Sequence, residues 1–206
     1  MTKDKRILAT LRKAYPLAKT ELLFNSPYEL LVATMLSAQT TDRQVNKTTP
    51  ELFSHYPTPQ ALATADCEHV AQLIQGVGLH RTKARHLVAT AKILTESFQG
   101  QVPQTLPELL TLPGVGRKTA KVVLANAFGI PALAVDTHVF RVARRLGLAN
   151  GKTTEQVEKE LESTIASDQW IAAHHRLIQH GRQVCRARQP LCNECCLRDY
   201  CPSVQN

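Results

Sequence analysis

The segment Leu-Pro-Gly-Val-Gly-Arg-Lys at residues 112–118 constrains the fold of this chain more than any other. Gly114 and Gly116 allow the backbone to turn sharply and to approach a partner closely. An apolar pattern with helical spacing follows at once, so the free N–H groups of the first helical turn point the same way as the turn. Lys118 lies in that first turn. The segment therefore predicts a phosphate-binding hairpin that leads directly into a helix with an amine at its start.

Helix start and stop signals recur along the rest of the chain. Residues 26–29 form a capping box with proline at the first helical position, and residues 105–108 repeat this pattern just before the glycine hairpin. No run of alternating apolar and polar residues is long enough to indicate a strand. We therefore expect an all-α fold. Beyond the helix that begins at residue 27, the patterns predict helices over 66–75, 81–98, 117–128, 137–147, 153–165 and 168–180.

Length and composition bound the class of protein. The 206 residues suffice for one large domain or two small ones, and an apolar content of 43% can form a core. The N-terminus is charged and no apolar stretch follows it, which argues against a secretory signal. The apolar-rich stretch 122–135 is too short and too broken by glycine and proline to span a membrane. We expect a cytoplasmic protein.

The formal net charge is +8, and the basic residues are grouped apart from the acidic ones. The first two basic groups are Arg81, Lys83, Arg85 and Lys92, then Arg141, Arg144, Arg145 and Lys152. Such a distribution suits a polyanion such as nucleic acid, and it is equally typical of solvated helix faces. Composition alone leaves both interpretations open.

Five of the six cysteines fall in the last 22 residues. The candidate metal ligands are Cys185, Cys192, Cys195 and Cys201. Disulfides are improbable inside the cell, so this spacing indicates a metal site, with zinc and an iron–sulfur cluster both open at this point. Cys196 directly follows a ligand and cannot easily share its geometry. Arg186 and Arg188 lie inside the first cysteine interval, where a rigid loop favours phosphate contact over simple solvation.

Three features now occur in one order: the hairpin with its lysine, the sequence Ala-Val-Asp-Thr-His at 134–138, and the four-cysteine spacing. Together they resemble the endonuclease III family of helix-hairpin-helix DNA glycosylases, from Ser26 to Cys201. The resemblance implies two helical domains that flank a DNA-binding cleft. One is a central helical barrel over 21–131, with the hairpin motif at about 106–128. The other is a discontinuous domain of 1–20 plus 132–206, with a [4Fe–4S] cluster held by the four cysteines.

The resemblance also assigns the catalytic residues. It makes Lys118 the nucleophile of a base-excision repair enzyme that removes oxidised or damaged pyrimidines. A Schiff base with the sugar then leads to β-elimination, which cleaves the strand 3′ to the abasic site. The attacking amine must be neutral, and the helix N-terminus together with burial in the cleft is expected to favour that form. Asp136 is the catalytic carboxylate, which stabilises positive charge on the sugar and also serves as an N-cap.

The same resemblance assigns DNA contacts. Leu79 is the wedge that enters the base stack, and Gln39 fills the space that the extruded nucleotide leaves. Gly114 and Gly116 grip phosphate without reading sequence. The expected partner is double-stranded DNA that contains damaged bases or abasic sites, bound by a monomer that is associated with the nucleoid through DNA. His80 departs from the aromatic residue common in the family.

Two alternatives stand beside this interpretation. A related glycosylase for mismatched adenine shares the fold and the cluster, but it lacks the hairpin lysine and carries a catalytic glutamate where this chain has no acid at 35–41. A non-catalytic helix-hairpin-helix module would use its cluster only for structure. The pairing of Lys118 with Asp136 argues against that module.

Overall fold

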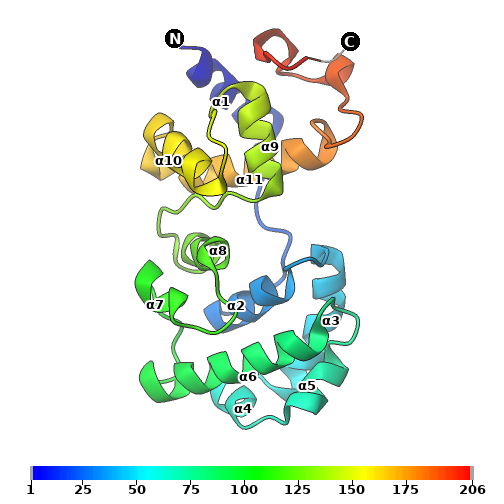
Figure 1. Ribbon diagram of the computed structural model, residues 1–206, viewed down its shortest axis with the longest axis vertical. Helices are drawn as coiled ribbons and strands as arrows, with labels where there is room; N and C mark the ends of the chain where they lie inside the picture. The colour runs from blue at the N-terminus through cyan, green and yellow to red at the C-terminus, as the bar shows by residue number, and fades with distance from the viewer. Residues whose placement is uncertain (1, 205–206) are drawn as a thin grey trace. The chain divides into compact units, whose positions relative to one another are not determined.

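The computed structural model describes residues 2–204, whose regular secondary structure is all helical, with no β-strand among the described residues. The expected all-α fold class is confirmed. The chain divides into two compact units (Figure 1). One is continuous, Glu21–Ile130, and the other joins the residues up to Thr20 to those from Pro131 onward. No helix within residues 2–204 combines the length and the apolar character of a membrane span.

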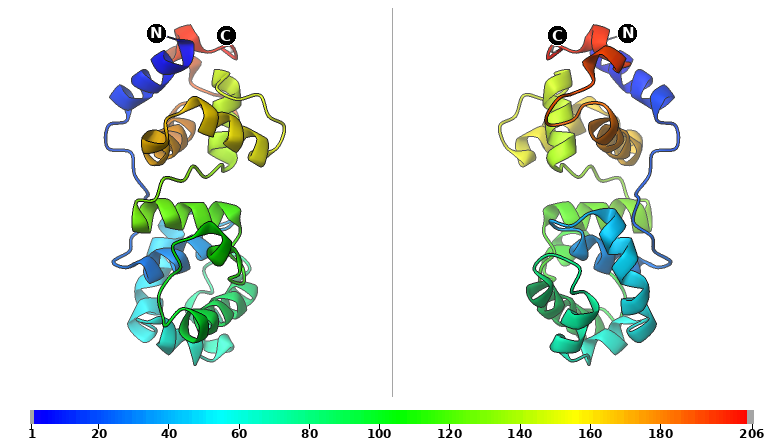
Figure 2. Two further views of the ribbon diagram at one scale, coloured as in Figure 1. Left: turned by 90° about the vertical axis from the view of Figure 1, so that its left-hand side faces the viewer. Right: turned by 90° about the vertical axis from the view of Figure 1, so that its right-hand side faces the viewer.

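The continuous unit is built around one nearly fully buried helix. Its helices are α2 (Pro27–Leu36), α3 (Asp42–His55), α4 (Pro59–Ala63), α5 (Cys67–Leu73), α6 (His80–Ser97), α7 (Leu106–Leu110) and α8 (Arg117–Phe128). Every residue of α2 from Tyr28 to Leu36 except Glu29 is buried, as expected for a central helix. The helices α3, α6 and α8 pack against it (Figure 2). The predicted capping box is half formed: Ser26 Oγ accepts the Glu29 amide at 3.2 Å, but the Glu29 carboxylate accepts the amide of Asn25 instead of that of Ser26.

Two helices of this unit escape the sequence patterns for physical reasons. Pro50 lies inside α3 and interrupts the pattern that would indicate a helix there. The five-residue α4 is too short to show a period. The long helix α6 packs against α4 and α5 and begins directly after Leu79, which makes no side-chain cap. These contacts fix the start of α6 beside the loop that follows α2.

The discontinuous unit draws its core from both ends of the chain. Its helices are α1 (Lys3–Ala14), α9 (Thr137–Leu146), α10 (Thr154–Thr164) and α11 (Trp170–Gln183), with the 3-10 turns η1 (Ser167–Gln169), η2 (Cys192–Glu194) and η3 (Arg198–Tyr200). The helix α11 packs against α1 and α9, and α10 packs against α9. Buried Ile7 and Leu11 of α1 belong to the same apolar core as Val139, Leu177 and Leu197. This core positions the cysteine-rich tail next to α9.

Candidate nucleic-acid interface and catalytic residues

The glycine hairpin connects α7 to α8 and is fixed from behind by α6. Thr90 Oγ1 donates to the carbonyl oxygen of Pro113 at 2.9 Å. Gly114 has a φ of 78°, in the left-handed region that favours glycine. A Cβ at this position would lie 2.7 Å from Nδ1 of His86. Both the backbone conformation and the lack of space therefore require glycine at 114.

Gly116 has no such requirement within the chain. Its φ of −91° and ψ of 174° are ordinary extended values. A Cβ here would meet nothing within 4 Å. As N-cap of α8 it supplies no side-chain hydrogen bond, so the first amides of the helix have no side-chain cap. An open, uncapped helix start without a Cβ suits the close approach of an anionic group.

Lys118 lies in the first turn of α8, and its side chain is exposed. The buried residues Ala120, Val123 and Leu124 anchor α8, so the backbone that carries the amine is well fixed. The amine is accessible to a ligand. Because the chain itself leaves Lys118 exposed, the burial expected from the sequence has to come from a bound partner.

Asp136 is the N-cap of α9. Its Oδ1 accepts the amide of Val139 at 2.7 Å, and the side chain is half-buried. The preceding residues 132–135 are buried, and His174 Nδ1 donates to the carbonyl oxygen of Ala134 at 2.8 Å. Asp136 therefore projects from a segment that α11 holds in place. It belongs to the discontinuous unit, whereas Lys118 belongs to the continuous one.

Gln39 and Leu79 lie on neighbouring loops of the continuous unit. Both are exposed, and both have positive φ values, 56° and 58°. A Cβ on Gly78 would lie 3.7 Å from the carbonyl oxygen of Gln39, which shows how closely the loops approach. Left-handed geometry costs a residue with a Cβ about 1–2 kcal/mol, so it persists only where the surroundings impose it.

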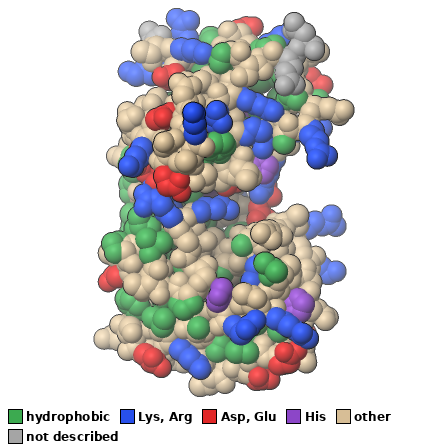
Figure 3. All heavy atoms as spheres, in the orientation of Figure 1, with side chains coloured by type: hydrophobic (Ala, Val, Ile, Leu, Met, Phe, Trp, Pro, Cys, Tyr) green, Lys and Arg blue, Asp and Glu red, His purple; other side chains and the backbone are tan. Residues whose placement is uncertain are grey.

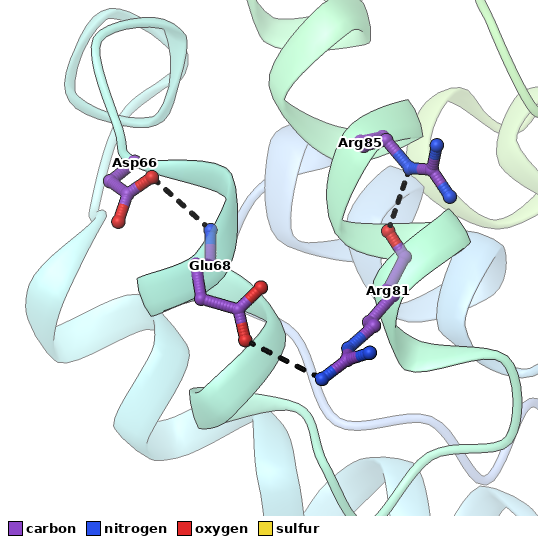
Figure 4. Close-up of polar contacts among 4 residues, drawn as sticks. All are labelled: Asp66, Glu68, Arg81 and Arg85. Atoms are coloured by element: carbon purple, nitrogen blue, oxygen red, sulfur yellow. Dashed lines mark hydrogen bonds and ion pairs between the residues drawn. The ribbon is translucent and has the colours of Figure 1, made fainter.

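The basic residues near the start of α6 do not form a uniform charged surface. Lys and Arg side chains are spread over both units, with acidic groups among them (Figure 3). Arg81 forms an ion pair with Glu68 of α5 at 4.0 Å, and Arg85 Nε donates to the carbonyl oxygen of Arg81 (Figure 4). Lys83 is buried and faces protein carbonyl groups. Lys83 therefore fits neither interpretation of its basic group, the polyanion-binding surface or the solvated helix face.

The four predicted metal ligands share one cavity, next to the C-terminal end of α9. The cysteines that line it are Cys185, Cys192, Cys195 and Cys201. Cys196 is exposed and is absent from the lining. Arg145 Nη1 donates to Cys185 Sγ at 3.6 Å, and the Leu197 amide donates to Cys195 Sγ at 3.4 Å. Burial raises the pKa of the Cys195 thiol, so a cationic group is needed to hold it as a thiolate.

The loop that carries Arg186 and Arg188 is tied to α9. Arg145 donates to the carbonyl oxygens of Arg186 at 2.7 Å and Ala187 at 3.1 Å. Arg141 Nε donates to the carbonyl oxygen of Cys185 at 3.1 Å. The side chains of Arg186 and Arg188 remain exposed. The loop therefore displays two guanidinium groups while its backbone is held by two others.

Sequence reasoning did not single out Lys83, Arg141, Arg145 or His174 for these positioning contacts. The two arginines appeared only as surface charge. The available signal was helical position: Arg141 and Arg145 are four residues apart and share a face of α9. That spacing indicates side chains that reach along a packed surface.

Comparison with known proteins agrees with this arrangement. The model of the HhH-GPD superfamily of base excision DNA repair proteins matches residues 32–167. Endonuclease III of Synechocystis sp. is 49% identical over 200 residues, which cover 97% of this chain and 91% of that protein. Endonuclease III of Escherichia coli strain K12 is 47% identical over 203 residues, which cover 98% and 96%.

Solved structures give the same result. A trapped covalent intermediate of endonuclease III with DNA has a TM-score of 0.93 at 43% identity and covers 98% of this chain and 97% of its own. A non-covalent endonuclease III–DNA complex has a TM-score of 0.94 at 43% identity, with coverage of 98% and 96%. A thermostable thymine-DNA glycosylase, 23% identical with a TM-score of 0.87, shares the fold. The chain therefore belongs to the HhH-GPD superfamily of base excision DNA repair proteins and, within it, to the endonuclease III family.

Proposed function

We propose that this chain is a DNA N-glycosylase and abasic-site lyase that excises oxidised or otherwise damaged pyrimidines from double-stranded DNA, with Lys118 as nucleophile. The observation that carries this proposal is an exposed primary amine in the first turn of α8, directly after the glycine hairpin. A Cβ on Gly116 would meet no atom within 4 Å, so a ligand can approach the hairpin at that point. A neighbour of 43% identity has been solved as a trapped covalent intermediate with DNA. Lys118 is the residue that we assign to such a bond here.

The chemistry follows from an amine and a sugar. Neutral Nζ of Lys118 attacks C1′, the glycosidic bond breaks, and the base leaves with the bonding electron pair and takes up a proton. Loss of a proton from nitrogen and opening of the sugar ring produce the Schiff base. Removal of a C2′ proton then expels the 3′ phosphate by β-elimination. Water hydrolyses the remaining imine and releases Lys118.

Asp136 supplies the negative charge in this scheme. A fixed carboxylate stabilises the positive charge that develops on the sugar as the base leaves, and it can accept and return protons. Its cap to α9 and the anchoring of Ala134 by His174 support a fixed orientation. We propose that the two units correspond to the two domains of the family. Because Lys118 and Asp136 lie in different units and act on one nucleotide in this scheme, bound DNA would contact both.

DNA contacts follow from the exposed loops. Gly114 and Gly116 approach the phosphate backbone, and Arg186 and Arg188 add charge-assisted contacts. Leu79 enters the stack and Gln39 occupies the space of the extruded nucleotide. Because these contacts read backbone and shape rather than bases, we expect binding to be salt-sensitive and largely independent of sequence. We propose that the protein binds DNA as a monomer in the cytoplasm.

We propose that Cys185, Cys192, Cys195 and Cys201 hold a [4Fe–4S] cluster. Four sulfur ligands around one cavity match the donor set of such a cluster. The cluster would secure the short tail and the loop with Arg186 and Arg188.

Trapping with borohydride tests the proposal. The protein is incubated with a duplex that carries thymine glycol, and borohydride is added to reduce any Schiff base. We expect a covalent protein–DNA adduct that disappears in Lys118→Ala and persists in Lys152→Ala, which removes one exposed lysine elsewhere. An adduct that survives in Lys118→Ala contradicts the assignment. Broad visible absorption of the purified protein separates an iron–sulfur cluster from zinc.

A further inference from the structure

Lys83 is a buried cation whose donors are all used within the protein. Its Nζ lies 2.8 Å from the carbonyl oxygen of Leu36, 2.5 Å from that of Ala38 and 3.4 Å from Thr40 Oγ1. An ammonium group has three N–H donors, and these three acceptors match them. Only 8% of Lys83 is exposed. It therefore cannot serve as a DNA-facing charge, and its contacts need another explanation.

The contacts of Lys83 join two loops. Leu36 is the last residue of α2, so the ammonium group lies at the negative end of this helix dipole. Its other two acceptors, on Ala38 and Thr40, lie on either side of Gln39 in the turn that follows. The backbone amide of Lys83 donates to the carbonyl oxygen of Leu79 at 3.0 Å. This is the first main-chain bond of α6, which any residue except proline would make at 83. The contribution specific to Lys83 is its side chain, which ties the loop of Gln39 to the first turn of α6, directly after Leu79.

Both loops hold a left-handed residue at the position assigned to DNA insertion. Gln39 has a φ of 56° and Leu79 a φ of 58°, and neither is glycine. The two loops touch at Gly78, where a Cβ would lie 3.7 Å from the Gln39 carbonyl oxygen, an ordinary contact distance. Without an internal anchor, each residue would relax toward more ordinary backbone geometry, and ordering it again would reduce the gain from binding.

We propose that Lys83 is a positioning residue that holds Gln39 and Leu79 as one preformed element for insertion into the DNA duplex. This inference rests on the proposed function, because it assigns a purpose to the two exposed loops. If the inference holds, Lys83 is not needed to cleave an abasic site in a single strand, because no nucleotide has to be extruded from a duplex there. Arginine is a poor substitute, since its planar fork cannot match acceptors arranged around an ammonium group.

The variant Lys83→Met tests this, with Lys92→Met as the control that removes one exposed charge from the same helix. Each protein is assayed under single-turnover conditions on a thymine glycol duplex and on a single strand that carries an abasic site. We expect the single-turnover rate of Lys83→Met to fall roughly 10- to 100-fold on the duplex and to stay within about twofold of the parental rate on the single strand. In the double variant Lys83→Met/Leu79→Ala, the rate on the duplex should fall by a smaller factor than the two single-variant factors multiplied together.

Hydrogen exchange supplies a readout independent of activity. The amide of Thr40 donates to the carbonyl oxygen of Ser37 at 3.1 Å within the turn, and we expect it to exchange faster in Lys83→Met than in Lys92→Met. If Lys83→Met does not fold by circular dichroism, Lys83→Gln, which keeps a donor, takes its place with a smaller expected effect. Equal losses on both substrates, or unchanged Thr40 exchange, would overturn the inference. A parent protein that forms no borohydride adduct overturns the proposed function instead, and Thr40 exchange still tests the anchor.

Discussion

Gly114 and Gly116 are two residues apart, and alanine is expected to lower mainly stability at the first and mainly DNA affinity at the second. Gly114→Ala meets both a positive φ and the ring of His86, so we expect the free energy of unfolding to fall by about 1–3 kcal/mol. Gly116→Ala has space and an ordinary φ, so we expect a loss under about 1 kcal/mol. Its affinity for an abasic duplex should fall about tenfold, because the added methyl group keeps phosphate from the α8 amides.

Urea unfolding and fluorescence anisotropy measure the two quantities separately. A Gly116→Ala protein with parental affinity for DNA would show that phosphate does not approach α8 at this point. A stable Gly114→Ala protein would show that the hairpin can shift away from His86.

Asp136 has a structural task as well as a proposed chemical one, and two substitutions separate them. Asn and Asp cap helices about equally well, so Asp136→Asn should keep the cap to Val139, whereas Asp136→Ala should lose about 1 kcal/mol of stability. Both remove the charge, so both should lower the single-turnover excision rate by roughly 100-fold. Full excision activity in a folded Asp136→Asn protein would exclude the charge from the reaction.

At the scale of elements, α9 serves two sites. Its first residue follows Asp136, and its last turn carries Arg145, which bonds the cysteine loop. A helix of ten residues is about 15 Å long and stiff. The position of the cysteine loop and that of Asp136, the proposed catalytic carboxylate, are therefore set by one element.

Arg145→Lys tests the hold on the cysteine loop. Arg145 reaches one sulfur and two carbonyl oxygens, and lysine cannot reproduce that fork. We expect chelator to bleach the visible absorption of Arg145→Lys several-fold faster than that of the parent protein, as the loop opens more often. Arg144→Lys is the control, since Arg144 is exposed and lies over the Phe140 ring at 5.3 Å. Equal bleaching in the two variants would contradict the role of Arg145.

The elements also show how far sequence reasoning reaches. Local signals were sufficient for α8, whose bounds Arg117–Phe128 match the predicted 117–128, because its caps and apolar period lie within the helix itself. They were insufficient for α3, where tertiary packing of Val45 and Leu52 outweighs an internal proline. Neighbouring loops could not be paired from sequence: only the fold shows that Lys83 faces residues about 45 positions earlier.

At the scale of the whole molecule, buried histidines couple stability to pH. Burial, together with the charges of His174 and Arg182, lowers the pKa of His175 to about 3. Below the unfolded value of about 6.5 the unfolded chain takes up a proton that the folded chain excludes. Stability is therefore expected to fall as pH falls from about 6.5 towards 3, by up to about 1.4 kcal/mol per pH unit from this residue.

His175→Gln removes this proton uptake. The free energy of unfolding, followed through the single tryptophan Trp170, should depend less steeply on pH between about 6 and 4 than in the parent protein. His55→Gln, an exposed histidine in the other unit, should leave the slope unchanged. An unchanged slope in His175→Gln would show that this ring is not held neutral.

The discontinuous core has a consequence for synthesis on the ribosome. Ile7 and Leu11 leave the ribosome more than a hundred residues before their packing partners on α9 and α11 and at Leu197. The intervening Glu21–Ile130 unit is continuous and can fold while the chain is still growing. Throughout that time α1 carries unpaired apolar side chains. A chain interrupted before α11 is complete therefore keeps an exposed apolar helix, the kind of surface that chaperones and proteases bind.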